Sequence, residues 1–207
     1  MFNVEDKYKH FDEVVDSVID SKAVPAWKTK STYYSWLRGG IRRIWGKHPL
    51  KMEFLKKKKK KIVNPNPTSR VRFPTVMGCE CYVCKKDFVL KEIEVDHIAG
   101  GKYTLTQSKD VEDFVLNILF VKESDLRTVC KNCHGILSYQ AKQGIKSFEK
   151  AKIEKEIIAL TQTKAKKFLD NWYKARGLKP ETNTSKRKAQ IRDVLYNENN
   201  LTGGIYD

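Results

Sequence analysis

Four of the five cysteines form two pairs at the spacing of a metal knuckle, Cys81-x-x-Cys84 and Cys130-x-x-Cys133. One turn of backbone at this spacing presents two thiolates to one ion, and two such pairs complete a tetrahedral four-thiolate zinc site. The 45 residues between the pairs exceed the usual zinc-ribbon spacer, so a whole structural unit must lie between the knuckles. Zinc would pin the ends of that unit and add to its folding free energy. Cys79 makes a poor pair with Cys84 and is interpreted as a buried or free thiol.

A carboxylate and two imidazoles accompany this cysteine frame. Asp96 and His97 end a strand-like segment at residues 93–98, and His134 directly follows the second knuckle. Either His alone is more often an ordinary surface, core or capping residue. Together, a carboxylate, an adjacent imidazole and a second imidazole beside a zinc knuckle are the parts of a hydrolytic metal site, with two ligands and a general base.

The order CxxC, VDHI and DLxxVCxxCH resembles the HNH endonucleases, or ββα-metal nucleases, and specifically the zinc-stapled kind found in bacteriophages. The resemblance covers roughly residues 78–140 and rests on five elements in order. It implies an α+β fold, in which a ββα-metal core with a four-cysteine zinc site is flanked by N- and C-terminal helices. The upstream segments WLRGGIRRIW and RFPT also look like phage members, although this likeness is weaker.

The resemblance implies a role for each motif residue. His97 matches the general base that takes a proton from the attacking water. Asp96 and His134 match the two protein ligands of a catalytic Mg²⁺ or Mn²⁺, and the implied products are a 5′-phosphate and a 3′-hydroxyl. The chemistry agrees independently, because an unperturbed His titrates near about 6.5 and therefore suits a base at neutral pH.

One position departs from the family pattern. The central Asn of the motif, which holds the base His in position with both a donor and an acceptor, aligns here with Asp125. An ionised Asp supplies only an acceptor. Asn117 lies eight residues further upstream and is the second choice for this role. Residues 100–123 form an insertion that lengthens the connection between strand and helix.

The chain has 207 residues and a formal charge of +16, and most of this excess lies in one segment. Residues 22–75 contain 16 Lys and Arg residues and a single acid, Glu53, which gives the segment a charge of +15. Basic side chains that neutralise phosphates release counterions, so the charge favours DNA or RNA as the partner over a merely solvated surface or an acidic membrane surface. The resemblance to the HNH endonucleases implies double-stranded DNA. The predicted contacts are Arg38, Arg42, Arg43, Lys56, Lys57, Lys58, Lys59, Lys60, Lys61, Arg70 and Arg72. Affinity and chemistry are thus expected in separate parts of the chain.

The composition and the sequence pattern exclude several other classes of protein. Hydrophobic residues make up 40% of the chain and aromatic residues 11%, which is enough for a globular core. The longest apolar stretch, at residues 114–121, is far too short to cross a membrane, and the N-terminus lacks the pattern of a secretory signal. We therefore expect a cytoplasmic protein, in the host cytoplasm if a phage encodes it, because a reducing compartment favours cysteines as metal ligands.

Hydrophobic periodicity predicts helices at residues 6–21, at 32–47 with a possible break at Gly39-Gly40, and from Pro49 into the lysine run. Short strands are predicted at 88–90 and 93–95, and one long helix at 147–176. The predicted organisation is a helical basic DNA-binding region at 1–63, a linker at 64–75, an HNH core with zinc at 76–146, and a long helix with a loose tail at 147–207.

Two functions fit these observations. The first is a metal-dependent DNA endonuclease, acting as a monomer or weak dimer, whose single site per chain nicks one strand. The second is a non-catalytic, zinc-stabilised nucleic-acid-binding or phage assembly protein with a degenerate site, which the Asp at position 125 favours.

Overall fold

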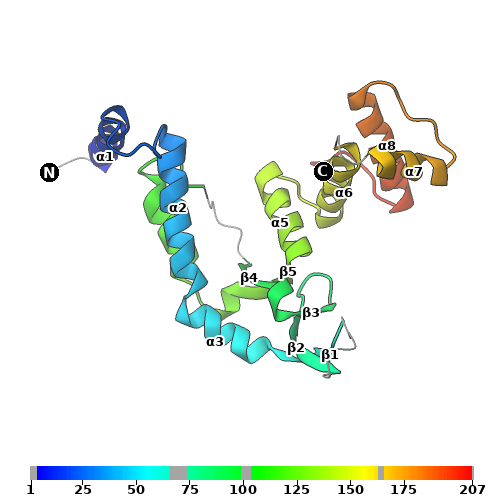
Figure 1. Ribbon diagram of the computed structural model, residues 1–207, viewed down its shortest axis with the longest axis horizontal. Coiled ribbons are helices and arrows are strands. Elements are labelled where there is room, and N and C mark those ends of the chain that lie inside the picture. The colour runs from blue at the N-terminus through cyan, green and yellow to red at the C-terminus, as the bar shows by residue number, and fades with distance from the viewer. Residues whose placement is uncertain (1–3, 66–73, 99–103, 163–165, 207) are drawn as a thin grey trace. The chain divides into compact units, whose positions relative to one another are not determined.

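The computed structural model describes residues 4–65, 74–98, 104–162 and 166–206. Within these ranges the chain forms eight α-helices and five β-strands, and the strands make one three-stranded and one two-stranded sheet (Figure 1). The α+β class expected from the sequence is confirmed. The chain divides into two compact units, Met1–Cys130 and Lys131–Asp207.

Three helices begin the first unit: α1 (Val4–Asp20), α2 (Lys30–Gly46) and α3 (Pro49–Lys58). Thr29 caps α2, because its hydroxyl accepts a hydrogen bond from the backbone N–H of Thr32. Pro49 occupies the first turn of α3, where a missing N–H leaves no helical bond unmade. All three predicted helices of this region are present.

The helix α2 is continuous through Gly39 and Gly40, so the possible break is not observed. Two glycines weaken a helix by about 1 kcal/mol each, but α2 buries one face of aromatic and aliphatic side chains. Tyr34, Ile41 and Trp45 are the buried residues of that face. Tertiary packing therefore outweighs the low propensity of the glycine pair.

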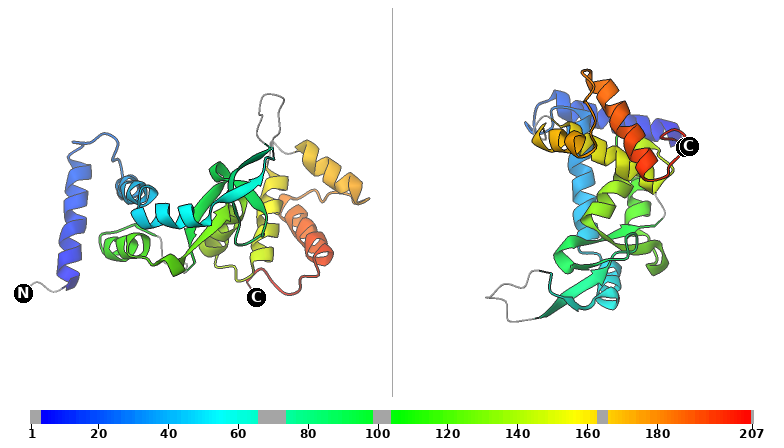
Figure 2. Two further views of the ribbon diagram at one scale, coloured as in Figure 1. Left: turned by 90° about the horizontal axis from the view of Figure 1, so that it is seen from below. Right: turned by 90° about the vertical axis from the view of Figure 1, so that its right-hand side faces the viewer.

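The three-stranded sheet follows α3 directly (Figure 2). It consists of β1 (Lys60–Val63), β2 (Thr75–Glu80) and β3 (Asp87–Val89), paired antiparallel in the order β1-β2-β3. The helix predicted from Pro49 into the lysine run is present and ends at Lys58. Lys60 and Lys61 belong to β1, where the buried side chain of Ile62 holds the strand against the sheet.

The compact units of the chain do not divide at the predicted linker at 64–75. The backbone N–H of Asn64 donates to the carbonyl of Pro74 at 2.9 Å, which closes the β1-β2 hairpin. Residues 66–73 lie outside the described part of the chain. The division of the chain falls instead after Cys130, because β1 joins the sheet that also contains β2 and β3.

The second sheet pairs β4 (Ile93–His97) antiparallel with β5 (Leu126–Cys130). Between these strands lie α4 (Asp110–Leu119) and the 3-10 turn η2 (Glu123–Asp125), and the short turn η1 (Leu90–Glu92) precedes β4. The insertion at 100–123 thus contains a helix. The helix α5 (Lys131–Gln143) follows β5 at once, so the chain order from β4 onward is strand, helix, strand, helix.

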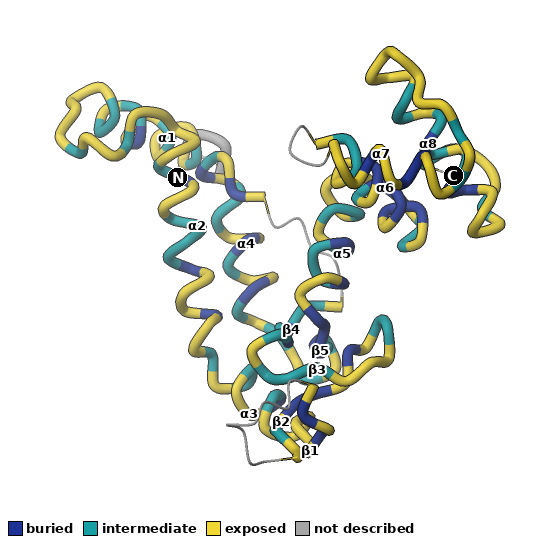
Figure 3. The backbone as a smooth tube through the Cα atoms, turned by 45° about the vertical axis from the view of Figure 1, so that its right-hand side comes forward, coloured by how far each residue is buried: buried dark blue, intermediate teal, exposed yellow. Residues whose placement is uncertain are grey.

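The core of the first unit lies between the N-terminal helices and the inserted helix α4, whose buried sides are visible in Figure 3. Tyr34 and Phe114 are among the largest fully buried side chains. Tyr34 donates its hydroxyl to Asp12 at 2.7 Å, and Asp12 also accepts the backbone N–H of Ser108 at 3.0 Å. Contacts from α1 and α2 therefore fix the insertion within the first unit.

The second unit is helical and consists of α5 (Lys131–Gln143), α6 (Phe148–Thr161), α7 (Lys166–Ala175) and α8 (Thr184–Glu198). The predicted single helix at 147–176 is wrong, because α6 ends at Thr161 and Gln162 is extended. The predicted loose tail is also wrong. Asn183 caps α8, and Ile191 and Leu195 pack into a core with α6 and α7.

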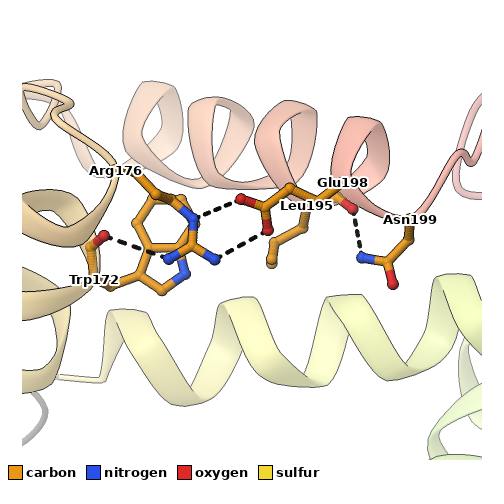
Figure 4. Close-up of polar contacts among 5 residues, drawn as sticks. All are labelled: Trp172, Arg176, Leu195, Glu198 and Asn199. Atoms are coloured by element: carbon orange, nitrogen blue, oxygen red, sulfur yellow. Dashed lines mark hydrogen bonds and ion pairs between the residues drawn. The ribbon is translucent and has the colours of Figure 1, made fainter.

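Ion pairs tie α8 to its neighbours in this second unit. Arg176 at the end of α7 binds both carboxylate oxygens of Glu198, at 2.8 and 3.0 Å, and stacks over the ring of Trp172 (Figure 4). Arg192 of α8 forms the same bidentate ion pair with the buried carboxylate of Glu154 in α6, in which Nε and Nη2 each donate to one carboxylate oxygen. The sequence did not predict α8 as a helix. Its polar side chains bind partners in or next to other helices, and the local sequence pattern does not reveal such partners.

A Gly78→Ala substitution is expected to lower the free energy of unfolding by about 1–3 kcal/mol. A Cβ at Gly78 would lie within 3.0 Å of the Ile62 side chain and of the Phe88 backbone oxygen. Gly39→Ala is the matched control, since its methyl group would lie 3.7 Å from the Arg43 side chain and α2 would gain about 1 kcal/mol. Urea denaturation measures both, and a Gly78→Ala variant as stable as the parent would contradict the observed strand pairing.

Candidate metal and catalytic site

The two predicted cysteine pairs come together in one cluster. The sulfur atoms of Cys81, Cys84, Cys130 and Cys133 all lie within 4.8 Å of one another. Four thiolates around one tetrahedral zinc, with Zn–S bonds of about 2.3 Å, need sulfur separations of this order. The quartet can therefore hold a metal ion such as zinc, and within the described ranges it is the only close group of three or more His, Cys, Asp and Glu ligands.

Local backbone geometry shapes the first knuckle. Cys81 follows β2, its N–H donates to the carbonyl of Lys86, and its carbonyl accepts the N–H of Lys85, both at 2.9 Å. Burial raises the pKa of the Cys81 thiol, but N–H groups that include those of Cys130 and Cys84 outweigh it and bring the pKa to about 7. A thiol so close to ionisation is prepared to act as a metal ligand.

Cys79 is not part of this quartet. It is fully buried in β2, and burial raises the pKa of its thiol. The interpretation of the fifth cysteine as a buried thiol agrees with this position, because a raised pKa keeps the sulfur protonated.

His97 ends β4 and is half-buried against elements that are distant in the sequence. Its Nε2 lies 3.3 Å from the backbone oxygen of Ile118, at the end of α4. Its ring packs on the ring of Trp45 from α2, with centroids 4.6 Å apart and planes tilted by 39°. Burial lowers the pKa of the imidazole, against the opposing effect of the Ile118 carbonyl. The sequence predicted His97 as a site residue, but it predicted neither Ile118 nor Trp45 as a neighbour of His97.

We expect His97 to titrate below the ordinary value of about 6.5. Because burial disfavours the imidazolium, neutral His97 stabilises the fold above pH 6.5, and this contribution is lost as the pH falls through the lowered pKa. An NMR titration of the ring protons without divalent ions measures the value. The same residue in urea-unfolded protein is the reference, and a folded pKa at or above the unfolded one would contradict the burial argument.

Asp96 lies opposite Arg127 in the pairing of β4 with β5. Both Nε and Nη2 of Arg127 donate to Asp96 Oδ2, at 2.9 and 2.8 Å, and both side chains are largely buried. The predicted metal ligand is therefore held by a cation in this structure. Sequence reasoning missed Arg127, although the antiparallel register of the two strands would have placed it across from Asp96.

Asp125 is tied to the segment after His97 through its backbone. Its carbonyl accepts the N–H of Ile98 at 2.7 Å, while its carboxylate accepts the N–H of Lys122 at 2.8 Å. Both contacts need only an acceptor, so an Asp satisfies them. Asn117, the second choice for this role, is exposed on α4.

His134 is half-buried in the first turn of α5, immediately after Cys133. Asp96 belongs to the first unit and His134 to the second. Their predicted pairing as ligands of a Mg²⁺ or Mn²⁺ ion stays a prediction.

The predicted DNA contacts fall into three groups. Exposed side chains are those of Arg42, Arg43, Lys56, Lys57, Lys58, Lys59, Lys60 and Lys61. Some of these pair with acids, since Lys57 binds Glu123 and Lys60 binds Asp87. Arg38 is half-buried and donates to the carbonyl of Leu105 at 3.4 Å. Arg70 and Arg72 lie outside the described residues.

Among the described residues, no helix combines the length and apolar character needed to span a membrane. Comparisons of the chain with protein-family models, with curated proteins and with solved structures found no match.

Proposed function

We propose that this chain is a metal-dependent endonuclease of the HNH type that nicks double-stranded DNA and leaves a 5′-phosphate and a 3′-hydroxyl. The observation that carries the proposal is the setting of His97. In the tautomer whose Nε2–H donates to the Ile118 carbonyl, Nδ1 carries the lone pair that accepts a proton. An acceptor at one ring nitrogen fixes the tautomer and orientation of an imidazole, as a carboxylate does for the general-base histidine of the Ser-His-Asp triad.

Two further contacts restrict His97. Trp45 packs on the imidazole face and limits rotation of the ring. The Ile98–Asp125 backbone hydrogen bond holds the chain directly after His97. A base held in one orientation reaches an attacking water without first losing rotational freedom, which is a large part of the advantage of a positioned catalytic group. Burial also favours neutral His97 at pH 7, the form that a base requires.

The second part of the proposal is a catalytic Mg²⁺ or Mn²⁺ held by Asp96 and His134. A carboxylate oxygen and an imidazole nitrogen are a donor set that such ions accept. The ion would supply charge neutralisation at the scissile phosphate. Arg127 fixes the Asp96 carboxylate by a single oxygen. The two hydrogen bonds from Arg127 therefore define the orientation of the Asp96 carboxylate.

The proposed substrate follows from charge. Residues 22–75 carry a net charge of +15, so the exposed lysines and arginines on α2, α3 and β1 outnumber the acids of that segment. Contacts of this kind bind phosphates regardless of sequence. Each chain has one such site, which would cleave one strand, so a monomer or weak dimer would produce nicks first.

Supercoiled plasmid incubated with the full chain tests the proposal. With Mg²⁺ or Mn²⁺ we expect conversion to the open-circular form before any linear DNA appears, and no conversion when these ions are omitted. The nicked ends should be sealed by DNA ligase without added kinase, because ligase requires a 5′-phosphate and a 3′-hydroxyl. Plasmid that stays supercoiled with either ion would refute the proposed activity.

A non-catalytic zinc module that binds DNA is the second candidate. The Asp96–Arg127 ion pair favours it, because a carboxylate already neutralised by a guanidinium is a weaker ligand for a second cation. This candidate predicts salt-sensitive DNA binding without cleavage, and no change in binding on Asp96→Ala substitution.

A further inference from the structure

Lys51 of α3 is the one lysine of that helix that is not fully exposed. Its Nζ lies over the ring of Trp45, 5.4 Å from the centroid. The same indole packs on the imidazole of His97 at 4.6 Å. A lysine from the basic segment therefore shares an aromatic neighbour with the candidate general base.

The surroundings of Lys51 do not neutralise its charge. Among the described residues, its ammonium makes no hydrogen bond or ion pair, and it lies over the ring of Trp45. Burial lowers its pKa, and only a longer-range attraction to Glu94 opposes this effect. A half-buried cation without a carboxylate partner is destabilising unless something else binds it.

Lys51 and His97 also act on one another electrostatically, because the positive charge of Lys51 helps to lower the pKa of His97. Geometry relates them as well, because the Lys51 ammonium and the His97 imidazole lie 5.4 and 4.6 Å from the centroid of the same Trp45 ring. In contrast, Lys57 of the same helix binds Glu123 and Lys56 lies near Glu53, so these lysines already have acidic partners. Among these three lysines of α3, Lys51 is therefore the one without a salt bridge.

We propose that Lys51 binds the phosphate group of a phosphodiester next to His97 and so contacts the substrate at the reacting end of the site. This inference rests on the proposed nuclease function for the identity of the phosphodiester as DNA. The phosphate oxygens would accept the hydrogen bonds that the ammonium lacks, and partial burial strengthens this attraction relative to that of a fully exposed lysine.

The binding test uses the full zinc-loaded chain without Mg²⁺ or Mn²⁺ and takes inorganic phosphate as the probe. NMR follows the His97 ring protons and the Trp45 indole N–H during the titration. We expect saturable shifts of both in the parent protein. Lys51→Gln and Lys51→Met should each weaken phosphate binding at least about tenfold, because one charge-assisted contact is lost.

Lys47→Gln is the matched control, since Lys47 is an exposed lysine at the end of α2. It should bind phosphate as the parent does. Lys51→Met retains most of the aliphatic packing on Trp45, so a melting temperature near that of the parent excludes loss of folding as the cause. Phosphate binding that is equally strong in the parent and in both Lys51 variants would overturn the proposal.

A second measurement separates this inference from the proposed function. In plasmid nicking, Lys51→Gln should lower kcat about 10- to 100-fold, while the Kd for duplex DNA changes less than about threefold, because many other cations contribute to it. Lys51→Arg should restore part of the rate. Lys51-dependent phosphate binding in a parent protein that does not nick would refute the nuclease alone, whereas nicking that is unchanged by Lys51→Gln would refute the role of Lys51 alone.

Discussion

A Cys130→Ser variant is expected to lose its metal ion and, with it, the folded structure around the two sheets. Cys130 ends β5, lies opposite Ile93 of β4, and donates its N–H to the sulfur of Cys81 at 3.3 Å. Structural zinc contributes about 10–16 kcal/mol of apparent binding free energy in small zinc peptides at neutral pH. This is comparable to the whole stability of a typical domain, about 5–15 kcal/mol.

Zinc content and thermal unfolding measure this effect together. We expect one zinc per parent chain, and none with a lost or broadened melting transition in Cys130→Ser. Cys79→Ala is the control, because Cys79 is buried in β2 but lies outside the metal cluster. It should keep its zinc and lose only about 1–2 kcal/mol of stability. A Cys130→Ser protein that keeps zinc and melts like Cys79→Ala would contradict the four-cysteine site.

A variant of the neighbouring residue His134 tests which residues are structural and which are proposed to be catalytic. His134 follows Cys133 directly but does not belong to the cysteine cluster. His134→Ala should therefore retain zinc and melt close to the parent temperature, while plasmid nicking is lost. If His134→Ala instead unfolds as Cys130→Ser does, the division into one structural and one catalytic ion is refuted.

The cysteine cluster could be predicted because its information is local. Two C-x-x-C pairs each determine the position of two sulfurs within one turn, and only the meeting of the pairs depends on the fold. The helices α1, α2 and α3 were predictable for the same reason, since their apolar residues recur within the helix itself.

The strand β1 could not be predicted in this way. Its lysines continue the lysine run of α3, and nothing within Lys60–Val63 shows that Thr75–Glu80 will pair with it. The sequence did not predict α8 for a related reason. Its sequence is polar, and the partner of Arg192 is Glu154, 38 residues earlier in another helix. Pairings between distant segments override local propensity.

The environment of His97 changes the interpretation of the charge distribution. The sequence predicted affinity in the basic segment and chemistry in a separate part of the chain. In the structure these two parts meet, because Trp45 of the basic segment packs on His97 and Lys51 of the same segment lies over the Trp45 ring. The insertion contributes as well, through the carbonyl of Ile118. Three segments that are distant in the sequence therefore build the surroundings of one imidazole.

A His97→Ala variant is expected to lower the rate of plasmid nicking by a factor of about 10²–10⁴, the usual contribution of a positioned general base. Without the imidazole, the attacking water has no base at this position. The Kd for duplex DNA should stay close to that of the parent, since phosphate contacts come from the exposed cations of α2, α3 and β1. Single-turnover nicking and a binding titration measure the two quantities separately.

His97→Gln sharpens this test, because a Gln amide can still donate to the Ile118 carbonyl but has no basic nitrogen. If basicity is what matters, Gln and Ala should be equally slow, and the pH dependence of the parent rate below pH 6.5 should disappear in both. His10→Ala, at an exposed position on α1, should nick at the parent rate. Nicking by His97→Gln at the parent rate would show that His97 only supports the fold, because a side chain that keeps the hydrogen bond without the base would then be sufficient.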